Sequence, residues 1–132
     1  MGAFRRRWPG LSYGRGEDWH YVGESGEPAF QNSWANISAN PKMAFRIREA
    51  GIVDIHGVIV GGASGAVIFT LPEGYRPSSA AASPVYADAG GGPIVASVNV
   101  TTAGAVSASF GTPGAVVLIS GQFFLAMPDV AP

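Results

Sequence analysis

Apolar and polar residues alternate most regularly between residues 43 and 60. In the run MAFRIR every second residue is apolar, and Arg46 and Arg48 lie on the opposite side. The run IVDIHGVIV repeats the pattern, with Asp54 and His56 opposite its apolar face. Alternation with a period of two is typical of a strand that has one buried face. Because a short Ala-Gly turn separates the two runs, they predict a β-hairpin.

Further runs rich in strand-forming residues follow at short intervals, and turns containing glycine or proline separate them. The chain holds 19 glycines and 10 prolines, spread along its length, and no stretch predicts a helix. We therefore predict an all-β fold, either an antiparallel sandwich or a barrel. Its later strands are expected at 66–71, around Val85-Tyr86, at 93–101, at 103–110 and at 115–126.

The first 18 residues show neither the period of a strand nor that of a helix, and they are predicted to form an extended arm. A head domain is predicted from 19 to 132. The arm carries four arginines before residue 17 and no acid there, and aromatic residues flank the basic run. We expect Arg5, Arg6, Arg7 and Trp8 to dock the arm on another protein rather than on nucleic acid.

The segment 21–41 is rich in turn-forming residues and precedes the predicted hairpin. Its large apolar side chains are its only candidates for contact with a hydrophobic core. We predict that Phe30, Trp34 and Ile37 anchor this segment, with Trp34 packed in the core.

Charged residues make up only 13% of the chain, while 47% of the residues are hydrophobic. Typical soluble domains are roughly 25% charged, so part of the surface is expected to be covered by another chain. The chain has no cysteine, which excludes disulfides and thiolate catalysis. No apolar run reaches the roughly 18 residues of a membrane-spanning helix, and we expect no membrane insertion.

Catalytic chemistry has few candidates. Asp54 and His56 share one face of a predicted strand, but no serine is placed by a motif to complete a triad. Glu24 and Glu27 could form a carboxylate pair, although acids in a glycine-rich loop are more often solvated. His20 falls in the N-terminal extended segment, away from His56, so the spacing predicts no metal site. We expect no enzyme activity and no cofactor.

The remaining candidate chemistry is binding. Aromatic rings can stack on sugar rings, and an arginine can form paired hydrogen bonds with a polar ligand. The candidate ligand-binding residues are Trp19, Tyr21, Tyr75, Arg76 and Tyr86. For Tyr75 and Arg76 an architectural role at the turn PEGYRP is an equal alternative, because prolines on both sides make that turn rigid.

Four segments also resemble a known family: PAFQNSWAN (28–36), MAFRIREAGIVDIHGVI (43–59), IFTLPEGYRP (68–77) and VVLISGQFF (116–124). Their order and spacing resemble those of the C-terminal β-sandwich head domains of bacteriophage tail-fibre, minor tail and receptor-binding proteins. The resemblance covers about residues 19–126, and LPEGYRP is its most specific element. His56 stands where that family commonly has arginine.

The resemblance implies a homotrimeric, jelly-roll-like β-sandwich knob on a virion, made in the host cytoplasm, that binds a host cell-wall glycan. The arm is then expected to attach the knob to other virion proteins. The alternatives are a capsid or tail decoration protein with a purely structural role and, from another class, a glycan-degrading enzyme. The residues expected to support the fold or the trimer are Trp34, Phe45, His56, Pro72, Gly74, Pro77 and Phe123.

Overall fold

The computed structural model describes residues 17–37, 41–48, 51–88, 90–111 and 115–125, and at 118 and 120–125 it describes the backbone alone. The described part contains nine strands and no helix. The strands are β1 (His20–Tyr21), β2 (Ala35–Asn36), β3 (Ala44–Ile47), β4 (Ile52–Val60), β5 (Val67–Thr70), β6 (Ala81–Asp88), β7 (Pro93–Val100), β8 (Ala105–Phe110) and β9 (Val116–Leu125).

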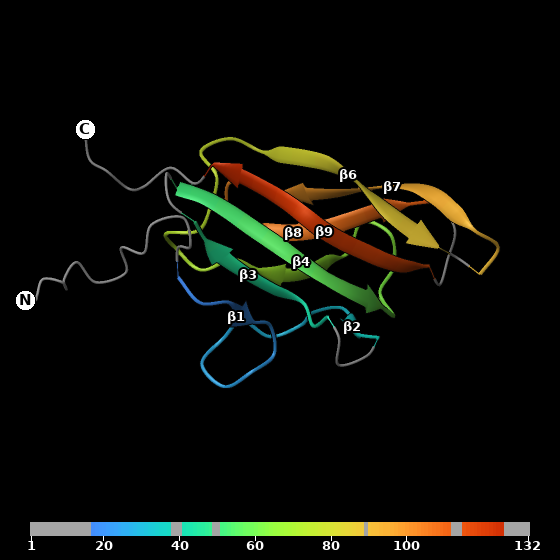
Figure 1. Ribbon diagram of the computed structural model, residues 1–132, viewed down its shortest axis with the longest axis horizontal. Helices are drawn as coiled ribbons and strands as arrows, with labels where there is room; N and C mark the ends of the chain where they lie inside the picture. The colour runs from blue at the N-terminus through green and yellow to red at the C-terminus, as the bar shows by residue number, and fades with distance from the viewer. Residues whose placement is uncertain (1–16, 38–40, 49–50, 89, 112–114, 126–132) are drawn as a thin grey trace, which may run out of the picture.

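The strands form one sheet in the order β1-β3-β4-β9-β6-β7-β8-β5, and β2 also pairs with β4. Every described strand pair is antiparallel. β9 is the last strand in the sequence, and it lies between the β3–β4 hairpin and the β6–β7–β8 meander (Figure 1). The predicted all-β antiparallel fold is thereby confirmed.

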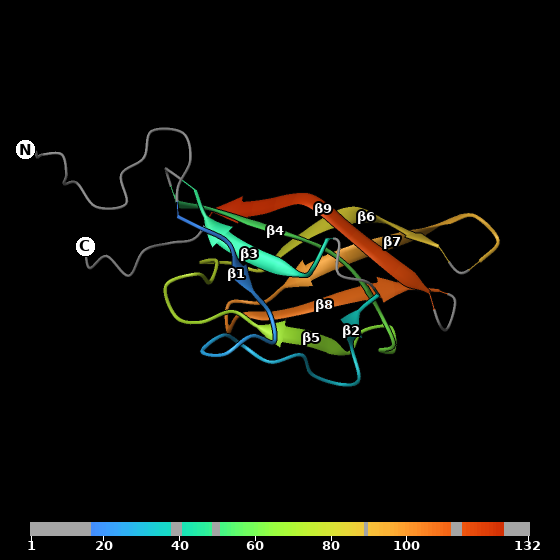
Figure 2. The same ribbon diagram turned by 60° about the horizontal axis from the view of Figure 1, so that its bottom comes forward.

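The sheet curls into a half-barrel, so strands near its two ends face each other (Figure 2). The rings of Phe45 on β3 and Phe69 on β5 stack with their centroids 5.6 Å apart. Both side chains are fully buried. The inner face of the curled sheet is therefore the hydrophobic core, and strands that are remote in the strand order meet across it.

The β1–β2 connection covers the outer edge of β5. The backbone N–H of Gln31 donates to the Ile68 carbonyl at 2.8 Å, and the Asn32 side chain donates to the Val67 carbonyl at 2.9 Å. Trp34 is buried, as predicted, and its indole N–H donates to the Ala66 carbonyl at 3.2 Å. These bonds occupy backbone groups that would otherwise offer an edge to another strand.

The predicted hairpin is confirmed in its position and in its faces. β3 and β4 pair in register, with Phe45 opposite Ile55 and Arg46 opposite Asp54. Burial alternates along the whole of β4. The strand predicted around Val85-Tyr86 is longer than expected and begins at Ala81.

The prediction that Ile37 is an anchor is wrong, because its side chain is 47% exposed. Asn36 turns towards the hairpin and accepts a hydrogen bond from the Met43 N–H at 2.8 Å. The next residue, Ile37, bonds through its N–H to the Val58 carbonyl at 3.1 Å. Alternation along the strand then directs the Ile37 side chain outward.

Candidate functional site

The turn PEGYRP forms a corner between β5 and β6. The Tyr75 N–H donates to the Pro72 carbonyl at 3.1 Å, and Gly74 has a φ of 91°, which suits a residue without a β-carbon. The corner brings Tyr75 back over the core, where its ring meets Phe45 edge-on at 5.2 Å. Pro72 and Gly74 thus place the tyrosine against the opposite end of the sheet.

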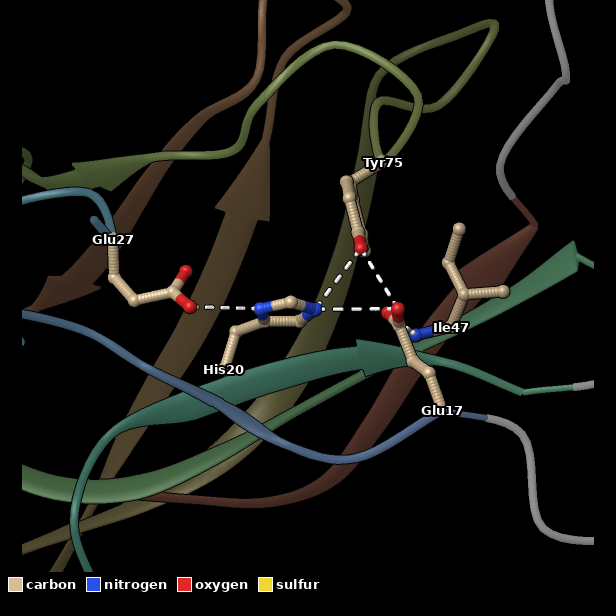
Figure 3. Close-up of polar contacts among 5 residues, drawn as sticks. All are labelled: Glu17, His20, Glu27, Ile47 and Tyr75. Carbon is tan, nitrogen blue, oxygen red and sulfur yellow. Dashed lines mark hydrogen bonds and ion pairs between the residues drawn. The ribbon is translucent and has the colours of Figure 1, made fainter. Parts of the chain in front are cut away.

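The Tyr75 hydroxyl belongs to a group of four polar side chains, which we call the His20 cluster. The cluster consists of Glu17, His20, Glu27 and Tyr75 (Figure 3). The Tyr75 hydroxyl donates to Glu17 Oε1 at 3.0 Å and lies 3.1 Å from His20 Nε2. His20 Nδ1 lies 2.9 Å from Glu27 Oε2, and His20 Nε2 lies 3.2 Å from Glu17 Oε1. The imidazole therefore has a carboxylate at each nitrogen.

The backbone positions this cluster through β1 and β3. Alternation along β1 turns His20 inward, where its ring stacks on Phe45 at 5.2 Å. Two hydrogen bonds join Glu17 to Ile47 at the end of β3. Its N–H donates to the Ile47 carbonyl at 3.2 Å, and its Oε2 accepts from the Ile47 N–H at 2.9 Å.

The carboxylates control the protonation of the cluster. Burial lowers the pKa of His20, but hydrogen bonds and charge attraction from Glu27 and Glu17 outweigh it and raise the pKa overall. Burial and then the hydrogen bond to Glu17 raise the pKa of Tyr75 far above its usual range. Tyr75 therefore keeps its proton and acts as a hydrogen-bond donor.

Arg76 contributes to the same corner. Its Nε–H donates to the Leu71 carbonyl at 2.8 Å, so its described contact is to backbone rather than to an acid. Gly104 lies directly against the Arg76–Leu71 hydrogen bond. A β-carbon at Gly104 would lie 2.7 Å from both Arg76 Nε and the Leu71 oxygen, so the position has no room for a side chain. Of the two predicted roles for Arg76, the contacts favour the architectural one.

A second polar group lies on the outer face of the hairpin. The Trp19 ring stacks on His56 at 4.1 Å, and the Arg46 guanidinium lies 4.3 Å from the same ring. Asp54 Oδ2 lies 2.8 Å from Arg48 Nε and 3.6 Å from Arg46 Nε. Burial and the nearby Arg46 charge lower the pKa of His56, partly opposed by Asp54. Asp54 and His56 share a face, as predicted, but Asp54 pairs with arginines and His56 stacks on tryptophan.

The other two candidate aromatic residues are exposed. Tyr21 is 36% exposed, and the Lys42 ammonium lies 5.9 Å from the centre of its ring. Tyr86 on β6 is 47% exposed, and its hydroxyl donates to Asp88 at 3.3 Å. The five predicted ligand-binding residues thus occupy three places: the corner, the outer face of the hairpin and the outer face of β6.

The sequence analysis missed the role of Glu17 and His20. The pattern predicts an extended segment at His20, whereas His20 begins β1 and faces the core. The alternation of Trp19, His20 and Tyr21 was the available signal, but three residues are too few to establish a period. Arg5, Arg6, Arg7 and Trp8 lie outside the described residues, as does the side chain of Phe123.

Within residues 17–125, leaving aside the undescribed gaps, no three His, Cys, Asp or Glu side chains are arranged to hold a metal ion. The same part of the chain contains no helix that is long and apolar enough to cross a membrane. The chain matches no protein-family model, no curated protein and no solved structure.

Proposed function

We propose that this protein is a non-enzymatic structural protein of a bacteriophage virion, a trimeric knob that binds host cell-wall glycan. The proposal starts from the sequence resemblance, whose most specific element, LPEGYRP, forms the corner that joins the two ends of the curled sheet. In this proposal the two halves of the curled sheet act as the two layers of a jelly-roll-like sandwich.

The observation that carries the proposal is the outer face of β6, β7 and β8, which has one charged side chain, at the end of β6. Between Ala81 and Phe110 the only charged residue is Asp88, whose carboxylate accepts hydrogen bonds from the Gly90 and Gly92 N–H groups. Cross-strand neighbours place eight uncharged side chains on the outside of these strands. These side chains belong to Ala82, Pro84, Tyr86, Val95, Ser97, Asn99, Ser107 and Ser109.

This face suits contact between copies of the chain. Val95 is 93% exposed, and it lies directly opposite Tyr86, which is 47% exposed. Exposed apolar side chains grouped on one surface are typical of an interaction site. Because its only charge is Asp88 at one end, this face meets other copies of the chain with little charge repulsion, which suits the contacts of a homo-oligomer. Tyr86 is therefore assigned to the trimer interface.

The glycan is assigned to the opposite half of the outer surface, where Trp19 and Tyr21 lie on the same side of β1. Arg46 and His56 support the Trp19 ring, and Lys42 lies beside Tyr21. Aromatic rings surrounded by charged hydrogen-bonding groups can bind the apolar face and the hydroxyls of a sugar.

A non-enzymatic role is supported by the basic side chains that contact each of the candidate acids. Asp54 pairs with two arginines, Glu27 contacts His20, and Glu24 lies 3.5 Å from Lys42. None of these carboxylates is paired with another across an open site in the described contacts. Turnover of a glycan that is lost on changing Glu24 or Asp54 would contradict this part of the proposal.

The test is a glycan array of bacterial cell-wall fragments, read with the intact protein. We expect specific binding, reduced about two- to tenfold by Trp19→Ala, because one stacking contact contributes roughly 0.5–1.5 kcal/mol. Tyr75→Phe is the matched control, since Tyr75 lies at the corner, and it should retain binding. An absence of hits across diverse cell walls would favour a decoration protein instead.

A further inference from the structure

The His20 cluster is the group of titratable side chains that the proposed function leaves unexplained. It joins the residues on either side of β1 to the corner between β5 and β6, since Tyr75 lies 58 positions after Glu17 and 55 after His20. Its members are partly buried, and the side chains of Glu17, His20 and Glu27 are 34%, 31% and 24% exposed. Solvent protons can therefore reach the cluster, while its geometry is set by the surrounding packing.

Hydrogen-bond counting shows why the proton on His20 matters. A protonated imidazole has two N–H donors, and here each nitrogen lies beside a carboxylate oxygen, at 2.9 Å from Glu27 and at 3.2 Å from Glu17. A neutral imidazole has one N–H. Loss of the proton therefore leaves one carboxylate facing a nitrogen lone pair.

The contact of His20 with Glu27 is shorter than its contact with Glu17, so Glu27 is expected to keep the N–H donor of the neutral ring. If Nδ1 keeps its proton for Glu27, then Nε2 becomes an acceptor, and the Tyr75 hydroxyl at 3.1 Å can turn to donate to it. Glu17 Oε1 then loses both His20 and Tyr75 as donors. Of the contacts described for the Glu17 carboxylate, the bond from the Ile47 N–H to Oε2 remains.

The two charged groups that contact His20 are both carboxylates, and both favour its protonated form. Glu17 approaches from the segment before β1, Glu27 from the β1–β2 connection and Tyr75 from the corner. β3 presents the apolar ring of Phe45 to the imidazole. The cations Arg46 on β3 and Arg48 just after it lie on the other face of the hairpin, where both contact Asp54 and Arg46 also contacts Trp19.

We propose that protonated His20 holds the Glu17 carboxylate against β1 and the corner, in addition to the direct hydrogen bonds between Glu17 and Ile47 on β3. Loss of the proton loosens Glu17 while the β-sheet stays intact. Glu17 is thereby held in place on the acidic side of the transition and less constrained on the alkaline side. This inference does not depend on what the head binds.

The direction of the pH dependence follows from the difference between the folded and unfolded pKa of each histidine. A histidine whose folded pKa is raised stabilises the fold fully below its unfolded value of 6.5, and this contribution is lost as the pH rises through the folded pKa. His56 has a lowered folded pKa, so its contribution is present above 6.5 and is lost as the pH falls through the folded pKa. The two histidines therefore act in separate pH windows, and His56 serves as an internal reference.

The experiment is an NMR titration of the whole protein that follows both imidazole signals and the backbone amides of Glu17 and Ile47. We expect His20 to titrate above 6.5 and His56 below it, and both amides to shift with the His20 midpoint. Glu27→Gln should lower the His20 midpoint and move both amide transitions with it. Glu24→Gln is the matched control on the same connection, because Glu24 contacts Lys42, and it should leave the midpoint unchanged.

Trypsin provides a second measurement, because Arg15 lies two residues before Glu17. Cleavage after Arg15, relative to a reference peptide in the same tube, should increase as the pH rises through the His20 midpoint. A His20 midpoint at or below 6.5 would overturn the proposal. Amides of Glu17 and Ile47 that ignore the His20 midpoint, or relative cleavage that stays constant across it, would overturn it as well.

Discussion

Gly57→Ala is expected to destabilise the protein by about 3–5 kcal/mol, a large part of the roughly 5–15 kcal/mol that stabilises a native protein. A β-carbon at this position would lie 2.4 Å from Met43 Cα and 2.8 Å from Met43 N. Gly57 also has a φ of 150°, at a register shift between β4 and β9. The Met43 backbone, next to β3, approaches β4 so closely here that only a residue without a side chain fits.

Met43 cannot move aside cheaply. Its side chain is fully buried, its N–H donates to Asn36 Oδ1 at 2.8 Å, and its carbonyl accepts from the Val22 N–H at 3.0 Å. Moving this backbone would break those bonds and open the core beside Phe45. The clash is therefore expected to appear as lost stability rather than as a local adjustment.

Urea unfolding monitored by circular dichroism measures the effect of Gly57→Ala. Gly91→Ala is the matched control, because a β-carbon there meets nothing within 4 Å and the residue has no positive φ. Its free energy of unfolding should stay within about 0.5 kcal/mol of the parent. Equal unfolding midpoints for the two variants would contradict the close approach of β4 to Met43.

Phe45→Ala is expected to cost about 3–5 kcal/mol, because it empties the centre of an aromatic group. The Phe45 ring lies 5.2 Å from His20, 5.6 Å from Phe69 and 5.2 Å from Tyr75. These partners come from both ends of the curled sheet. The substitution therefore removes the main contact between β3 and β5 and also the apolar support of the His20 ring.

Comparison with two other variants separates this effect from simple loss of apolar area. Phe45→Leu keeps most of the volume and should cost roughly half as much as the alanine variant. Val95→Ala changes a side chain that is 93% exposed and should leave the free energy of unfolding within about 0.5 kcal/mol. A cost below about 1.5 kcal/mol for Phe45→Ala would contradict the packing across the half-barrel.

The sequence predicts the β3–β4 hairpin well because its signal is local. Alternation along β4 extends over nine residues, and the burial of Val53, Ile55 and Ile59 follows from it directly. β6 was predicted too short because Pro84 interrupts its pattern. Proline lacks an N–H for a sheet ladder, but the β9 ladder reaches only Tyr86 to Asp88, so this strand tolerates it.

The His20 cluster could not be predicted in the same way. Its hydrogen bonds join Tyr75 to Glu17 across 58 positions and to His20 across 55 positions. Those contacts exist because the sheet curls and brings the corner over β1, and curvature has no local sequence signal. The pattern of LPEGYRP indicates a rigid turn, but not which side chains its tyrosine meets.

The most direct test of the proposed trimeric knob is the solution mass of the purified protein, measured by light scattering behind a sizing column. The account predicts a mass near three times the 13.5 kDa of one chain. It also predicts a lower mass for Val95→Lys, which places a charge on the outer face of β6, β7 and β8 at a side chain too exposed to disturb the fold. A single-chain mass at every concentration, or a trimer that Val95→Lys leaves intact, would contradict it.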